Sequence, residues 1–139
     1  MGQSRAIRTI YDDPMWETLA SGVLRLQQCC NCRSFRYPPG PTCHRCASPE
    51  HKWKPVSGRG QILSWVVFHR TYFDDYPAPY NVVAVKLEEG PMIVTNLTGK
   101  KPMGSWIGRS VELCFERHSN HGLVPRVKLA GDDHRNVED

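Results

Sequence analysis

The sequence predicts a mainly β protein made of a short N-terminal helix, a small metal-stabilised β ribbon and a five-stranded β-barrel. Three observations support this prediction: an amphipathic repeat near the start, two Cys-x-x-Cys pairs after it, and a series of short apolar segments in the second half. We expect the helical part to cover residues 1–23, the ribbon 24–54, the barrel 55–130 and a polar tail 131–139. A chain of 139 residues suits this plan, because a metal replaces much of the core that a small ribbon lacks.

The first predicted element is a short helix that begins near Asp13. An aspartate can cap the first turn, and Pro14 fits there because proline needs no hydrogen-bonded N–H at that position. Gly22 is the expected end of the helix. Apolar residues repeat at i, i+3, i+4 and i+7, as on one face of a helix: Trp16, Leu19, Ala20 and Val23.

Two closely spaced pairs of cysteines predict a metal site in the ribbon: Cys29, Cys32, Cys43 and Cys46. Each pair can give two sulfur ligands to one tetrahedral ion, and the proline-rich loop between the pairs brings them together, as in a rubredoxin-like ribbon. Zinc is favoured over iron, because structural zinc is common in closed sites of this kind. All four ligand positions are taken by protein, so the metal is expected to be structural.

Two details of the cysteine segment refine this prediction. Arg33 and Ala47 follow the second and fourth ligand cysteines, at positions where a positive φ lets backbone N–H groups point at sulfur and where glycine would adopt it more easily. Cys30 lies too close to Cys32 to form the ligand pair with it. We interpret Cys114 as a half-buried strand residue rather than a catalytic thiol, because no base is recognisable beside it.

Five apolar segments separated by turn residues predict five strands, over residues 62–68, 83–88, 92–97, 111–116 and 126–129. Five antiparallel strands fit a small Greek-key barrel of the OB type, because closure protects the strand edges. Residues 97–107 are expected to cross over between the third and fourth strands. The loop before the second strand is rich in aromatic residues and proline, and is either a docking surface or a lid over the barrel end: Tyr72, Phe73, Tyr76, Pro77, Pro79 and Tyr80.

The remaining polar residues do not predict a catalytic site. None of the six histidines lies in a spacing that pairs it with a carboxylate or a nucleophile in a known mechanism. His118 and His121 flank a predicted turn, where a polar hairpin tip is favoured over a second metal site. The two acidic pairs are interpreted as solvated loop residues: Asp74 with Asp75, and Asp132 with Asp133.

Positive charge is concentrated in the ribbon. Seven bases and one acid lie between Arg25 and Arg59, whereas residues 61–139 hold nine bases and ten acids. A phosphate-rich partner near the ribbon fits this pattern. Binding of single-stranded nucleic acid is the alternative function, although the barrel half lacks a basic excess. No apolar run approaches the length of a membrane span and the start has no secretory apolar stretch, so we expect a cytoplasmic protein that does not bind a membrane.

Several motifs follow one another in order between Pro14 and Ala130. They are Trp16, Gly22-Val23-Leu24-Arg25-Leu26-Gln27-Gln28, the two cysteine pairs, Phe35-x-Tyr37-Pro38-Pro39, Ser57-Gly58-Arg59-Gly60, Gly90-Pro91 and Thr95-Asn96. Together they resemble the acyl-CoA-associated family of zinc-ribbon and OB-fold proteins. The cysteine pairs alone would not single out this family, whereas the ordered set is far more specific.

The resemblance implies a non-catalytic, accessory role. Members of this family resemble small partners of thiolase-superfamily enzymes, including acyltransferases, thiolases, hydroxymethylglutaryl-CoA synthases and lipid-transfer-type aldolases. It therefore implies a hetero-oligomer in which this chain supports a thiolase-like subunit and helps to hold CoA or acyl-CoA. The family often has arginine after the two prolines, where this chain has Gly40. Other residues are then the candidate contacts with CoA or the partner: Arg36, Arg45, Arg59, Tyr37 and Tyr80.

Overall fold

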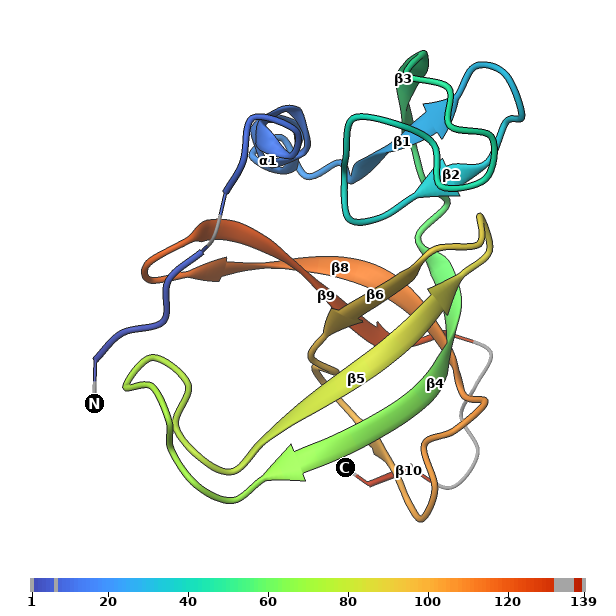
Figure 1. Ribbon diagram of the computed structural model, residues 1–139. Helices are drawn as coiled ribbons and strands as arrows, with labels where there is room; N and C mark the ends of the chain where they lie inside the picture. Colours follow the sequence, from blue (N-terminus) through green and yellow to red (C-terminus); the bar gives the residue numbers. More distant parts are fainter. Residues whose placement is uncertain (1, 7, 132–136, 139) are drawn as a thin grey trace.

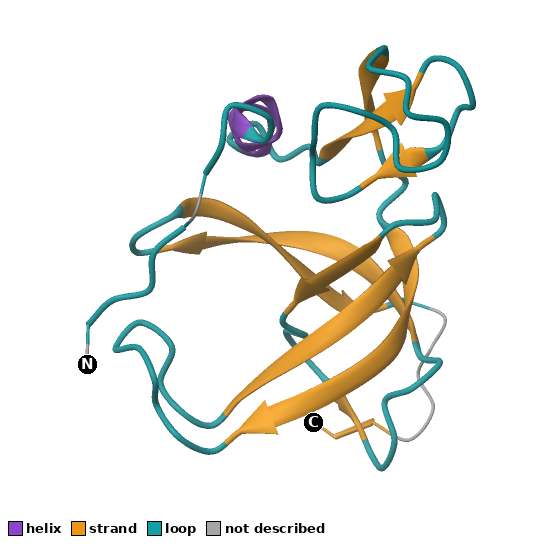
Figure 2. Ribbon diagram, in the orientation of Figure 1, coloured by secondary structure: helices purple, strands orange, loops and turns teal. Residues whose placement is uncertain are grey.

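The computed structural model describes residues 2–6, 8–131 and 137–138 of the chain. Two β modules lie one above the other, and a helix lies beside the smaller, upper module (Figure 1). Strands account for most of the regular structure in both modules (Figure 2). The architecture is the mainly β arrangement of helix, ribbon and OB-type barrel that the sequence predicts.

The ribbon is a three-stranded antiparallel sheet in the order β2-β1-β3. Its strands are β1 (Arg25–Cys29), β2 (Phe35–Arg36) and β3 (His51–Pro55). The central strand, β1, pairs Gln27 with Arg36 on one side and with Trp53 on the other. The first cysteine pair therefore begins at the end of β1, in the turn that leads into β2.

The barrel module is a five-stranded sheet in the order β6-β5-β4-β8-β9, and every neighbouring pair is antiparallel. Its strands are β4 (Arg59–Phe68), β5 (Tyr80–Leu87), β6 (Met92–Thr95), β8 (Ser110–His118) and β9 (Gly122–Leu129). The first three strands form a meander and the last two return to the other side of β4, which is the Greek-key order of an OB-fold. This confirms the predicted strand set.

The sheet curls until its two outer strands approach each other beyond the end of β6. The Val127 N–H donates to the Asn96 carbonyl at 3.2 Å, and the Thr98 N–H donates to the Val127 carbonyl at 2.8 Å. The Thr95 hydroxyl donates to the Pro125 carbonyl at 2.8 Å. A bulge in β4 between residues 62 and 64 assists the curvature, because an extra residue bends the strand that carries it.

One apolar core runs through the barrel and into the upper module. The crossover after β6 sends Trp106 inward, where its ring stacks on Trp65 with centroids 4.5 Å apart. Leu19 of the helix and Leu24 and Leu26 of the ribbon belong to the same buried cluster as the barrel residues. The barrel contribution consists of the following side chains: Ile62, Val83, Val85, Leu87, Ile93, Leu97, Trp106, Val111 and Val127.

The Ser-Gly-Arg-Gly motif is explained by the entry of the chain into β4. Gly58 has φ +85°, a conformation that glycine adopts without strain. Gly60 lies so close to β5 that a Cβ atom would be 2.5 Å from the Lys86 carbonyl oxygen and 2.8 Å from a methyl group of Val85. The second glycine therefore permits the tight pairing of β4 with β5.

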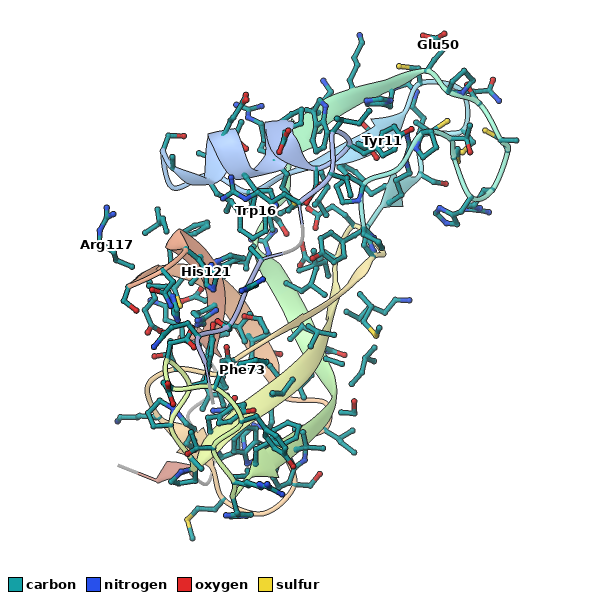
Figure 3. All side chains as sticks on the ribbon, turned by 60° about the vertical axis from the view of Figure 1, so that its left-hand side comes forward. Tyr11, Trp16, Glu50, Phe73, Arg117 and His121 are labelled. Atoms are coloured by element: carbon teal, nitrogen blue, oxygen red, sulfur yellow. The ribbon has the colours of Figure 1, made fainter. Side chains whose placement is uncertain are left out.

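The helix, α1, spans Asp13–Leu19. The prediction that Asp13 caps it is wrong: Asp12 occupies the cap position, and its carboxylate accepts hydrogen bonds from the Thr9 N–H and, at 2.9 Å, from the Trp16 indole instead of from the first-turn amides. Pro14 lies in the first turn as predicted. Met15, which the periodic pattern omitted, is buried, and Trp16 projects from α1 toward the barrel (Figure 3).

The crossover and the tail form one further pair of strands. The crossover contains β7 (Lys101–Pro102), which pairs with β10 (Val137–Glu138) in antiparallel fashion. The predicted polar tail otherwise falls largely on residues 132–136 and 139, which lie outside the described residues, and so do Asp132 and Asp133.

Candidate metal centre and ribbon groove

The two cysteine pairs have the same local backbone geometry. In the first, the Arg33 N–H donates to the Cys29 carbonyl at 3.0 Å; in the second, the Ala47 N–H donates to the Cys43 carbonyl at 2.9 Å. Arg33 has φ 67° and Ala47 has φ 64°, so both adopt the predicted positive φ despite their Cβ atoms. The repeated geometry turns both pairs of sulfur atoms toward one point.

The four sulfur atoms lie within 4.8 Å of one another. The Sγ atoms of Cys29 and Cys46 are 3.5 Å apart, and so are those of Cys32 and Cys43. A disulfide needs about 2.05 Å, whereas sulfur ligands at about 2.3 Å from a tetrahedral zinc lie roughly 3.8 Å apart. The spacing therefore fits a shared ion and not a disulfide.

The thiols of this cluster have unequal acidity. Hydrogen bonds from the Ser34 hydroxyl and backbone lower the pKa of Cys32 to about 6. A hydrogen bond from the Asn31 side chain lowers the pKa of Cys46. A backbone hydrogen bond from Cys32 lowers the pKa of Cys29, but burial and the adjacent sulfur atoms outweigh it, so that pKa is raised. Without a metal, the four thiols do not all ionise, because neighbouring thiolates repel one another. A divalent cation among the sulfurs stabilises the thiolate form of each.

A groove of about 670 Å³ lies beside the metal centre, between the ribbon and the turn that joins β5 to β6. The two walls of the groove are far apart from each other in sequence, since one comes from residues 32–45 and the other from residues 89–91. Arg33 and Arg45 are exposed cations in the lining. The acid in the lining, Glu89, accepts a hydrogen bond from the Ser57 N–H at 2.6 Å.

Of the five predicted contact residues, Arg36, Tyr37 and Arg45 lie together in this groove. Arg36 is only 4% exposed, so its guanidinium forms part of the floor. Its Nε donates to the Gln27 side-chain oxygen at 2.8 Å, and one terminal nitrogen donates to the Gly40 carbonyl at 3.1 Å. The Gly40 N–H donates to the same Gln27 oxygen at 2.9 Å, so Gln27 and Arg36 together hold the proline-rich loop.

The structure places Arg59 and Tyr80 elsewhere. The Arg59 side chain is 68% exposed and pairs with Glu88 at 3.0 Å, and this hydrogen bond raises the pKa of Arg59. It lines a separate groove of about 570 Å³ on the barrel. Tyr80 begins β5 and stacks on Phe68 with ring centroids 5.1 Å apart, within the aromatic loop region.

Sequence reasoning missed two parts of the site. Gln27 was noted only as a motif residue, because nothing local shows that its amide will meet Arg36 and Gly40 across the sheet. His44 and Pro91 also line the groove, and their proximity arises only when the ribbon packs above the barrel. The Gly90-Pro91 motif was the sequence feature that could have indicated this second wall of the groove.

The interpretation of Asp75 as a solvated loop acid is wrong. Its side chain is 2% exposed and lies beside His118 and His121, which are themselves mostly covered. Burial raises the pKa of Asp75, but hydrogen bonds from the Ser4 hydroxyl and N–H outweigh this effect and lower the pKa to about 2. Cys114 is half-buried, as predicted. Within the described part of the chain, no helix is both long and apolar enough to cross a membrane.

Comparison with known proteins agrees with this architecture. Residues 16–52 match the family described as ChsH2, rubredoxin-like zinc ribbon domain, and residues 53–116 match ChsH2, C-terminal OB-fold domain. Fold and site thus define a zinc-ribbon and OB-fold protein. A DUF35 domain-containing scaffold protein of Methanocaldococcus jannaschii is 31% identical over 108 residues, which make up 76% of this chain and 70% of that protein. The chain belongs to this DUF35 family, which includes ChsH2.

Two further similar proteins are named as parts of enzymes. A probable enoyl-CoA hydratase alpha subunit of Thermomonospora curvata is 37% identical over 103 residues, which cover 73% of this chain but 32% of that protein, so the chain spans about a third of that relative. A chain of the solved Ltp2-ChsH2(DUF35) aldolase is 30% identical with a TM-score of 0.81, over 90% of this chain and 98% of that one. Scaffold proteins and enzyme subunits of this kind do not favour the nucleic-acid alternative.

Proposed function

We propose that the protein is a non-catalytic scaffold subunit of an acyl-CoA enzyme of the thiolase-like class, of which lipid-transfer-type aldolases are the nearest candidates. The observation that carries this proposal is the similarity to a chain of the Ltp2-ChsH2(DUF35) aldolase, because it extends over nearly the whole length of that chain and includes both modules. In this proposal the carbon–carbon chemistry belongs to the partner. The hydratase subunit among the relatives keeps open which acyl-CoA reaction the partner performs.

The four clustered cysteines are proposed to hold a structural zinc ion. Four sulfurs with this spacing complete a tetrahedral shell, and a complete shell leaves no ligand position for substrate or water. The ion would fix the two loops that carry the cysteines, and both of those loops line the groove. Zinc is thus proposed to support the binding surface rather than the reaction.

The ribbon groove is proposed to contact the phosphate groups of CoA shared with the partner. Arg33 and Arg45 supply exposed guanidinium groups, which bind phosphate by charge-assisted hydrogen bonds. Tyr37 supplies an aromatic side chain that is partly exposed on the same wall. Arg36 would act indirectly, by fixing the loop at Gly40.

Affinity purification of the tagged chain from its native lysate tests the scaffold proposal. We expect a thiolase-like subunit to be recovered in stoichiometric amount and to remain bound at high salt, because stable interfaces of this type are largely apolar. Recovery of nucleic acid alone, released as salt is raised, would refute the proposal and support the alternative.

Calorimetric titration of the purified complex with CoA tests the groove separately. Alanine at both Arg33 and Arg45 should weaken CoA binding at least ten-fold, since a hydrogen bond to a charged group is worth about 1.5–3 kcal/mol. Arg59→Ala is the matched control, because that arginine is exposed but lies outside the groove. Equal affinity of all variants would place CoA binding away from the ribbon without affecting the scaffold proposal.

A further inference from the structure

Three segments that are distant in sequence meet at the end of the barrel that the N-terminal segment contacts. They are the N-terminal segment at Ser4, the β4–β5 loop at Asp75, and the β8–β9 hairpin at His118 and His121. Figure 3 shows His121 on that hairpin, beside the path of the N-terminal segment. One ligand atom from each of the acid and the two histidines lies within 4.8 Å of the others.

The cluster is buried and its polar atoms are incompletely satisfied. Side-chain exposure is 2% for Asp75, 10% for His118 and 15% for His121. The Nε2 atom of His118 is buried without a hydrogen-bond partner among the described residues, although it lies 3.3 Å from an Asp75 oxygen, because the geometry is not that of a hydrogen bond. A buried nitrogen in this state requires an explanation, and an ion between the two groups provides one.

The distances agree with a shared ion. Nitrogen and oxygen ligands at about 2.0–2.1 Å from a tetrahedral metal lie roughly 3.3 Å from each other. The His118 Nε2 to Asp75 Oδ2 distance is 3.3 Å, and the His121 Nε2 to Asp75 Oδ2 distance is 4.0 Å. A small rotation of the His121 ring, which lies at a hairpin tip, closes the second distance. The Ser4 hydroxyl is 2.9 Å from His121 Nε2 and also bonds Asp75. An ion that takes the Nε2 lone pair must therefore displace this hydroxyl, which then faces the remaining side of the site.

We propose that Asp75, His118 and His121 bind one divalent transition-metal ion, separate from the cysteine centre, with the fourth position held by a water on the Ser4 hydroxyl. Two imidazoles and one carboxylate form a ligand set that such ions accept readily. Because the ligands come from two segments and Ser4 from a third, the ion staples the open end of the barrel and anchors the N-terminal segment.

Metal binding changes which ring nitrogen of His118 carries the proton. Its Nδ1 accepts a hydrogen bond from the Asn120 N–H at 3.0 Å, so in a neutral ring the proton is on Nε2. An ion at Nε2 moves that proton to Nδ1, and the Asn120 N–H must then turn to water. Asn120 is exposed at the hairpin tip, so this exchange costs little. The Asn120 amide is therefore a reporter of occupancy.

Titration of the full chain, with its ribbon metal in place, by Co²⁺ tests the proposal. We expect one additional equivalent to bind, without the sulfur-to-cobalt charge-transfer band that a cysteine site gives. A parallel titration with diamagnetic Zn²⁺, which causes no paramagnetic shifts, should shift the Asn120 amide resonance. His121→Ala should weaken this binding at least ten-fold, as expected when a ligand is removed. His69→Ala is the matched control, since His69 is exposed and lies outside the cluster.

Circular dichroism of His121→Ala and of a second variant, Asp75→Asn, separates loss of a ligand from loss of the fold. The proposal is overturned if no second equivalent binds at about 1 mM Co²⁺, the limit of weak specific affinity. It is equally overturned if His121→Ala and His69→Ala bind cobalt alike, or if the Asn120 resonance does not move. In those cases the cluster is a hydrogen-bonded junction only.

Discussion

Replacing Gly60 by alanine is expected to destabilise the barrel through a clash with backbone. The new Cβ would be 2.5 Å from the Lys86 carbonyl oxygen, 3.2 Å from its carbon and 2.8 Å from a methyl group of Val85. The oxygen cannot move away alone, because it belongs to β5, which pairs with β4 at Gly60 and Leu87. The two strands must therefore separate locally where the ladder begins.

The magnitude follows from two opposing effects. Overpacking that shifts backbone costs about 3 kcal/mol, while alanine reduces the entropy of the unfolded chain and returns roughly 0.4–1 kcal/mol. The net loss is about 2 kcal/mol. An unfolding entropy of about 2.1 cal/mol/K per residue gives roughly 0.3 kcal/mol/K for this chain, so Tm should fall by about 7 °C.

Thermal and urea unfolding, followed by circular dichroism at equal metal content, measure this change. Gly40→Ala is the matched control, because no heavy atom lies within 4 Å of its added Cβ, and its stability should change by less than about 0.5 kcal/mol. Equal stability of both variants and the parent protein would refute the steric argument. A lower stability of Gly40→Ala than of Gly60→Ala would be the opposite of the order that the steric argument predicts.

Three further changes have expected outcomes of different size. Gln27→Ala should lower the free energy of unfolding by about 3 kcal/mol in urea denaturation, because it leaves the Nε of the buried Arg36 guanidinium without its acceptor. Arg59→Ala should leave the same quantity unchanged, because its pair with Glu88 is exposed; a measurable loss would mean that the pair is structural. Cys43→Ser should remove one equivalent of zinc per chain by elemental analysis and abolish hydrogen-exchange protection in the ribbon. Retention of both zinc and protection would exclude the cysteine site.

The parts of the molecule that the sequence predicts well are those that local chemistry determines. Each cysteine pair closes through bonds between residues no more than five apart, so the spacing alone indicates the geometry. The barrel strands follow from alternation and turn residues, because one face of each strand must be buried. Trp106 was placed correctly within a crossover, but its stacking on Trp65 depends on the curvature of the whole sheet.

The parts that could not be predicted depend on contacts between residues far apart in sequence. Asp75 was interpreted as solvated because a loop acid usually is, yet the N-terminal segment and a hairpin more than 40 residues later cover it. Arg36 was grouped with Arg45 by charge, although one is buried and the other exposed. The sequence gives the sign of a side chain's charge, whereas only the packed structure shows whether that side chain is exposed.

The shared core bears on how the proposed binding groove works. If the ribbon were a separate unit on a flexible link, the two walls of the groove would have to be ordered each time a ligand bound, at a cost in free energy. Leu24 and Leu26 of the ribbon instead belong to the same buried cluster as Ile62 and Val85 of the barrel. The Val56 N–H also donates to the Leu24 carbonyl at 3.1 Å, just before the chain enters β4. Both walls are therefore fixed by the fold, and a ligand or partner meets a groove that is already formed.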